Sequence, residues 1–226
     1  MHRYVGLLLA FADVPPGAQA QGMPDGPVYV ATYVEVVPSA TADAATLLRQ
    51  YRDATRKDAG NLRAEAVQEA GRPGRFGVLA IWADPKAFEA HGKAAHTAQF
   101  RDRLKAIHTA PYDERVHNGM FVGPRTGAGA GAVFVMTHVD VPPPLKDTLV
   151  PMLKQLSEDS RREAGNQRFE VQQQNSRPNH FTVVEVWSDR KAYEGSIASA
   201  HKRQFRDKFA PMTGALYDER LYSALD

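Results

Sequence analysis

Residues 76–100 read FGVLAIWADPKAFEAHGKAAHTAQF, and residues 181–205 read FTVVEVWSDRKAYEGSIASAHKRQF. The second stretch lies 105 positions after the first, and the same shift aligns the flanking sequence on both sides without a gap. Between residues 60–115 and 165–220, 25 of the 56 aligned positions are identical. Two copies indicate a duplicated domain, because a solenoid needs more units to bury its faces.

The hydrophobic periodicities within one copy predict its secondary structure. Apolar and other side chains alternate over residues 28–36, as they do on a strand with two different faces. Apolar residues recur at helical spacing over residues 44–54, and Gly60 is a suitable stop for that helix. Two strands then flank a turn at residues 71–74, and a second, broken helix covers residues 85–107 before a last strand.

This order, βαββαβ, recurs in the second copy and predicts an α+β fold of two tandem ferredoxin-like repeats. In the second copy, Pro151 is expected to kink or delay the first helix. The helices of a ferredoxin-like repeat cover one face of its sheet, so the other face needs a cover. We expect the bare faces of the two copies to cover each other in a closed barrel, an intrachain pseudo-dimer. Further dimerisation of this unit stays possible.

Composition divides the chain into four segments. Residues 1–20 combine a positive start, a short apolar stretch and the small-residue site Ala18-Gln19-Ala20, which is the order of a signal peptide. A Gly-rich linker at residues 123–131 separates the first repeat, residues 27–122, from the second, residues 132–226. The signal predicts a periplasmic or secreted protein; without export, the protein is expected in the cytoplasm.

Charge and composition argue against several function classes. The net charge is +2 without a basic run, which predicts no nucleic-acid partner. The apolar stretch near the N-terminus is too short to span a bilayer, so no membrane partner is expected. Cysteine is absent, which excludes disulfides, thiolate metal sites and cysteine nucleophiles.

Aromatic residues and histidines recur at fixed spacings in both copies. The first copy contains Phe76-x5-Trp82-x5-Phe88-x2-His91-x4-His96-x3-Phe100, and the second contains Phe181-x5-Trp187-x5-Tyr193 and His201-x3-Phe205. This pattern resembles the antibiotic biosynthesis monooxygenase family. The resemblance implies dimeric α/β barrels, many of which oxygenate phenols or quinols without metal, flavin or haem. It therefore implies no cofactor, with a small aromatic substrate and molecular oxygen as partners.

His96 and His201 are the first candidates for catalysis. Each lies four residues before a phenylalanine, Phe100 or Phe205, so that imidazole and aromatic ring share one helix face. A histidine near its ordinary pKa can accept a proton at neutral pH, and a phenol or quinol reacts readily with oxygen as its anion. The alternative is a capping or surface histidine.

Phe100 and Phe205 are candidates for substrate binding, and so are six further residues that also have structural alternatives. The strand tryptophans are core residues or walls of a pocket for a flat substrate. The polar residues at the start of the second strand terminate a helix or hold an anion. These residues are Trp82, Trp187, Asn61, Asn166, Arg63 and Arg168.

The resemblance implies a glutamate before the strand tryptophan and a histidine on the second helix, and each copy lacks a different one of these two. The second copy has Glu185 where the first has Ala80, and the first has His91 where the second has Ser196. Because a carboxylate on an apolar strand face is costly without a partner, Glu185 is a catalytic candidate, as is His91. His91 and His96 are five positions apart, which on one helix points them in different directions and predicts no shared metal site.

Two functions remain open from the sequence. The first is a cofactor-independent monooxygenase that acts on a small phenolic or quinol substrate. The alternative is a non-catalytic ligand-binding or stress-response barrel whose sites have degenerated, since fold similarity alone does not establish chemistry.

Overall fold

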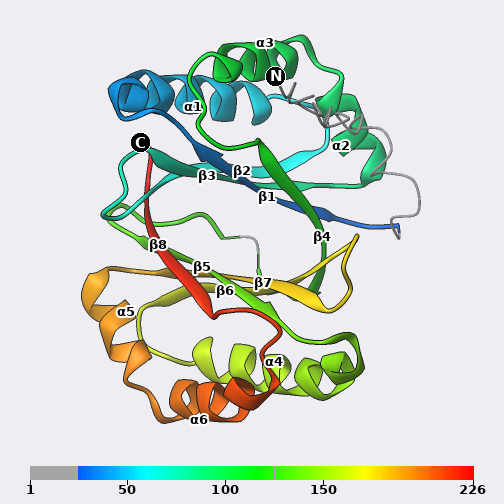
Figure 1. The fold of residues 1–226 in the computed structure, drawn as a ribbon, viewed down its shortest axis with the longest axis vertical. Helices are drawn as coiled ribbons and strands as arrows, with labels where there is room; N and C mark the ends of the chain where they lie inside the picture. The colour runs from blue at the N-terminus through cyan, green and yellow to red at the C-terminus, as the bar shows by residue number, and fades with distance from the viewer. Residues whose placement is uncertain (1–24, 125) are drawn as a thin grey trace, which may run out of the picture.

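The structure, a computed structural model, describes residues 25–124 and 126–226 (Figure 1). The expected signal peptide lies outside these residues. The first copy consists of β1 (Val28–Glu35), α1 (Thr41–Thr55), β2 (Asn61–Glu69), β3 (Arg75–Trp82), α2 (Pro85–Gly92), α3 (Ala95–Lys105) and β4 (Asp113–Phe121). The second consists of β5 (Val133–Asp140), α4 (Lys146–Ser160), β6 (Asn166–Gln174), β7 (His180–Trp187), α5 (Arg190–Ile197), α6 (Ala200–Phe209) and β8 (Asp218–Ala224).

The eight strands form one closed antiparallel barrel in the order β1-β3-β2-β8-β5-β7-β6-β4. Each copy contributes four adjacent strands, and the copies join where β8 pairs with β2 and where β4 pairs with β6. Helices α1–α3 cover the outside of the barrel on one side, and α4–α6 cover the opposite side (Figure 1). The predicted fold, two ferredoxin-like repeats that form an intrachain barrel, is confirmed.

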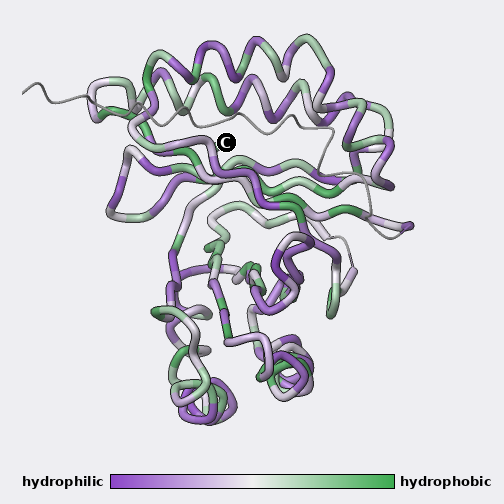
Figure 2. Tube along the Cα trace, turned by 45° about the vertical axis from the view of Figure 1, so that its right-hand side comes forward, coloured by the Kyte–Doolittle hydropathy of each residue, from purple (hydrophilic) through white to green (hydrophobic). Residues whose placement is uncertain are grey.

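The buried apolar side chains of the described residues form three layers. One lies between the helices and the sheet of each copy, around Leu48 and Phe76 in the first and around Leu149 and Phe181 in the second. The third fills the barrel interior with side chains of both copies, such as Met136. Figure 2 shows both hydrophobic and hydrophilic stretches along the strands; β1, β3, β5 and β7 are the apolar ones and are buried over most of their length.

The second helix of each copy begins at an aspartate N-cap and is broken into two pieces. The Asp84 carboxylate accepts a hydrogen bond from the amide of Ala87 at 2.8 Å, and the turn before β2 packs against the same residue. Gly60 adopts φ +79° there, and a Cβ on it would lie 2.5 Å from the Cβ of Ala87, so glycine is required. Extended backbone at Ala94 then separates α2 from α3, as the sequence predicts.

The first helix of the second copy is not delayed by Pro151, so that part of the expectation was wrong. Helix α4 begins at Lys146, the position equivalent to Thr41 at the start of α1, and carries Pro151 in its interior. Leu149 and Leu153 are fully buried on both sides of the proline, and this burial offsets the lost backbone hydrogen bond. Within the described residues, no helix is long and apolar enough to cross a membrane.

Candidate functional site

A group of polar and aromatic side chains lies between the helices and the sheet of the first copy. Tyr51 comes from α1, Asp58 from the turn after α1, His91 from α2 and His96 from α3, and Trp82 ends β3. The ring centroids of His91 and His96 are 5.4 Å apart, and those of Trp82 and His91 are 4.4 Å apart. The break between α2 and α3 thus gathers side chains from four elements around one point.

The prediction that His91 and His96 point in different directions was wrong. That expectation carried the periodicity of a single helix across the expected break, and five positions on a single helix correspond to well over one turn. The extended backbone at Ala94 restarts the helix in a new direction, and both rings then face Asp58.

Hydrogen bonds connect these residues in one chain. Nδ1 of His91 lies 2.6 Å from Oδ2 of Asp58, and Nε2 of His91 lies 2.8 Å from the Tyr51 hydroxyl. With the proton on Nδ1, His91 donates to the carboxylate and accepts from the phenol. Nε2 of His96 lies 3.2 Å from the same carboxylate oxygen, but this buried nitrogen forms no hydrogen bond with any described residue. The site therefore holds a buried imidazole nitrogen that contacts a carboxylate but forms no hydrogen bond with the described residues.

Burial sets the charge states of the inner residues. Desolvation lowers the pKa of His91, although the hydrogen bond and the charge of Asp58 oppose the shift. Burial also raises the pKa of Tyr51, whose ring stacks on Phe100 at 3.9 Å. At neutral pH the imidazole is therefore neutral and the phenol keeps its proton.

The outer residues of the site face solvent in part. The side chain of His91 is 6% exposed, whereas those of Asp58 and His96 are 22% and 25% exposed. Solvent therefore contacts Asp58 and His96, whereas His91 is buried behind them.

The second copy replaces this group with a buried ion pair. Oε2 of Glu185 accepts hydrogen bonds from Nζ of Lys202 at 2.6 Å and from Nε1 of Trp187 at 2.9 Å. Lys202 also donates to Ser196 at 3.1 Å, and Ser196 stands where the first copy has His91. Burial raises the pKa of the Glu185 carboxyl, and the Lys202 ammonium opposes that rise.

Lys202 was not among the residues that the sequence predicts at the site. Its signal was a difference between the copies directly after the shared histidine, Thr97 in the first and Lys202 in the second. Glu185 is thus neutralised within its own copy and is not a free carboxylate that faces a substrate.

His201 and Phe205 lie on one helix face, as predicted for the second copy, and line a small cavity of about 80 Å³ with Leu156. Nε2 of His201 lies 3.2 Å from Oγ of Ser160, and 3.8 Å from a carboxylate oxygen of Glu163. Unlike His96, this histidine has a hydroxyl partner and a more distant carboxylate.

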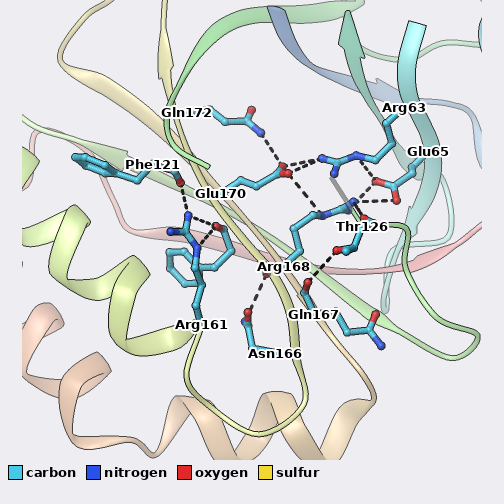
Figure 3. Close-up of polar contacts among 11 residues, drawn as sticks. Arg63, Glu65, Phe121, Thr126, Arg161, Asn166, Gln167, Arg168, Glu170 and Gln172 are labelled. Atoms are coloured by element: carbon cyan, nitrogen blue, oxygen red, sulfur yellow. Dashed lines mark hydrogen bonds and ion pairs between the residues drawn. The ribbon is translucent and has the colours of Figure 1, made fainter. Parts of the chain in front are cut away.

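The candidate arginines lie in the barrel and join the two copies (Figure 3). Arg63 donates from one nitrogen to both carboxylate oxygens of Glu170 at 2.8 Å. Arg168 donates to Glu65 at 2.7 and 3.2 Å. The two pairs are equivalent, since each residue lies 105 positions from its counterpart.

The nearby asparagines contact the backbone. Nδ2 of Asn61 lies 3.4 Å from the carbonyl oxygen of Arg63, and Nδ2 of Asn166 lies 3.5 Å from that of Arg168. Spacing along the chain did not reveal that these arginines pair with glutamates of the other copy. The Arg-x-Glu pattern at the start of β2 and β6 was the visible signal of this pairing.

The comparisons with known proteins agree with this architecture. A sequence model of the antibiotic biosynthesis monooxygenase family matches residues 27–103 and again residues 132–208. The chain belongs to this family. No curated protein matches the chain as a whole or in part.

Solved structures share the two-copy form of the antibiotic biosynthesis monooxygenase fold. A protein from Fusobacterium nucleatum named "putative monooxygenase" is 16% identical with a TM-score of 0.81, over 90% of this chain and 94% of that one. Another of the same name, from Lactobacillus acidophilus, is 13% identical with a TM-score of 0.73, over 89% and 95%. An anthrone oxidase-like protein is 10% identical with a TM-score of 0.69, over 91% and 93%. At these identities the likeness shows the fold alone.

Proposed function

We propose that the chain is a monooxygenase of small phenolic or quinol substrates, and that its reactive site is the Asp58–His91–His96 group of the first copy. Membership of the antibiotic biosynthesis monooxygenase family supports the reaction class. One observation carries the assignment to these residues: a buried imidazole nitrogen of His96 has no hydrogen-bond partner among the described residues and lies 3.2 Å from a carboxylate.

In this proposal His96 removes the proton from the substrate hydroxyl. The imidazolium that forms lies beside the Asp58 carboxylate, which stabilises the positive charge. His91 holds that carboxylate through the 2.6 Å contact, and Tyr51 in turn holds His91. His91 and Tyr51 act as positioning residues, because both are buried behind the pair that solvent reaches.

The reaction needs no added reductant. A hydroquinone anion is electron-rich and transfers electrons to O₂; one oxygen atom joins the ring carbon and the other leaves as water. The product is a hydroxyquinone, and the substrate supplies all the electrons. In the metal-free protein, acid–base groups and aromatic walls such as Trp82 are therefore sufficient for this chemistry.

The second copy fits the alternative function, a non-catalytic barrel whose site has degenerated. Its ion pair between Glu185 and Lys202 is satisfied internally, as in a barrel that keeps the fold after its site has changed. We therefore expect one active site per chain.

Oxygen uptake tests the proposal. Chelator-treated protein is incubated with a panel of hydroquinones and phenols, and the rate is compared with His96→Gln, Asp58→Asn and His201→Gln. Loss of a general base lowers the rate by about 100-fold or more, so His96→Gln should fall by this factor. His201→Gln, the same change at the equivalent position, should keep the wild-type rate. Uptake equal to buffer across the panel would contradict the substrate class, and full activity in His96→Gln would contradict the site.

A further inference from the structure

We propose that the first copy binds one divalent transition-metal ion through Asp58, His91 and His96. The proposal uses the same side chains as the proposed function but does not rest on it, because metal binding is measured without substrate.

The three side chains are already close enough to share one ion. Each offers a ligand atom, and these atoms all lie within 4.8 Å of one another. Nitrogen and oxygen ligands bind zinc at about 2.1 Å, which places two ligands of one ion roughly 3 to 3.4 Å apart. Oδ2 of Asp58 lies 2.6 Å from His91 and 3.2 Å from His96, so side-chain rotations alone bring the atoms to this spacing.

The free nitrogen of His96 is the second observation that indicates a ligand. Its Nε2 is buried, and none of the described residues forms a hydrogen bond with it. A buried polar atom without a partner is destabilising, and a metal ion would satisfy it. This nitrogen lies 3.2 Å from Oδ2 of Asp58, the same carboxylate oxygen that contacts Nδ1 of His91.

The residues behind the ligands suit a metal site as well. A histidine that binds a metal through one nitrogen usually donates a hydrogen bond from the other. Nε2 of His91 has such a partner in the hydroxyl of Tyr51 at 2.8 Å, and the Tyr51 ring is fixed by its stack on Phe100. With the proton on Nε2, Nδ1 of His91 is free to bind the ion.

The ligand types define the class of metal. Two imidazoles and one carboxylate suit zinc and the neighbouring first-row ions such as Fe²⁺ and Co²⁺, and three protein ligands leave positions open for water. Asp58 and His96 are each about one-quarter exposed or less, so an ion can reach the site from solvent.

The second copy lacks the same site and provides an internal control. Ser196 replaces His91, and the Lys202 ammonium donates a hydrogen bond to that serine at 3.1 Å. A fixed positive charge beside a missing ligand disfavours a cation. The expected stoichiometry is therefore one ion per chain, although the fold is duplicated.

Isothermal titration of the chelator-treated full chain with Zn²⁺, and visible spectra with Co²⁺, test the proposal. We expect one ion per chain and a Co²⁺ spectrum with nitrogen ligands. His96→Gln and Asp58→Asn should weaken binding by at least about 10- to 100-fold, whereas His201→Gln should bind as the wild type does.

A second variant protects the test against misfolding. Ala80→Glu/His91→Ser/Thr97→Lys copies the ion pair of the second repeat into the first, and it should fold and lose the site. Thermal unfolding verifies the fold of each variant. Absence of Zn²⁺ binding to the wild type up to millimolar concentration would overturn the proposal. Undiminished binding in His96→Gln, in Asp58→Asn and in the triple variant would overturn it as well. Binding lost in His201→Gln would overturn it too.

The metal and the proton compete for the same nitrogen of His96. Bound Zn²⁺ should therefore inhibit the metal-free oxygen uptake of the proposed function. If Zn²⁺ binds as expected but the metal-free protein consumes no oxygen, the metal site stands and the proposed function fails, so the two failures are distinguishable.

Discussion

Replacement of Glu170 by glutamine tests how the two copies are held together. The Glu170 side chain is 1% exposed and accepts hydrogen bonds from Arg63 of the other copy (Figure 3). Glutamine keeps the volume and removes the charge. The charge partner of Arg63 would then be the Glu65 carboxylate, 3.6 Å away. Arg168 already forms an ion pair with that carboxylate at 2.7 Å.

The structure sets the magnitude of the effect. Two guanidinium groups would share one carboxylate in the barrel interior, which leaves one buried positive charge without compensation. Removal of one partner from a buried ion pair costs about 3–5 kcal/mol of unfolding free energy. With a denaturant slope of about 1–3 kcal/mol per molar urea, the unfolding midpoint should fall by about 1 M or more.

Urea unfolding followed by circular dichroism and by tryptophan fluorescence measures this shift. Glu158→Gln is the control, because that side chain is 42% exposed and 3.9 Å from Lys154, and such pairs contribute at most about 1 kcal/mol. The double variant Arg63→Met/Glu170→Leu should recover much of the loss, since it removes both charges. A midpoint for Glu170→Gln equal to that of Glu158→Gln would refute the reasoning.

Three further predictions concern single residues. Lys202→Met leaves the Glu185 carboxylate buried without its cation, so urea unfolding should show that the free energy of unfolding falls by about 3–5 kcal/mol. The double variant Lys202→Met/Glu185→Leu should restore much of this loss, and equal stability of all three proteins would contradict a stabilising ion pair. Burial lowers the pKa of His117 to about 3, well below its value near 6.5 in the unfolded chain. The free energy of unfolding should therefore be unaffected by His117 above about pH 6.5 and should fall by about 1.4 kcal/mol per pH unit between about 6.5 and 3, because the unfolded chain binds a proton there and the folded chain does not. His117→Phe should reduce this slope, and an unchanged slope would contradict the prediction. Tyr51→Phe removes the hydrogen bond to His91 and should cost about 1 kcal/mol in the same unfolding assay, whereas an unchanged midpoint would show that the bond contributes nothing.

The sequence alone determined the duplication, the order of elements and the closed barrel. Hydrophobic periodicity reports which face of a strand or helix is buried, and this is a local property that spacing reveals. The sequence also predicted that the second helix is broken and that His201 and Phe205 share one helix face, but it did not place the break at Ala94. Asp58 could also have been noticed, because both copies carry an acidic residue two positions before the glycine that precedes the second strand.

The tertiary structure alone decided which of these side chains meet. His91 and His96 converge because extended backbone between two helices redirects the second, and periodicity along one helix cannot show that rotation. Glu185 receives its charge partner from α6, and Arg63 receives its partner from the other copy. Such contacts depend on how separate elements pack, whereas spacing along the chain describes each element by itself.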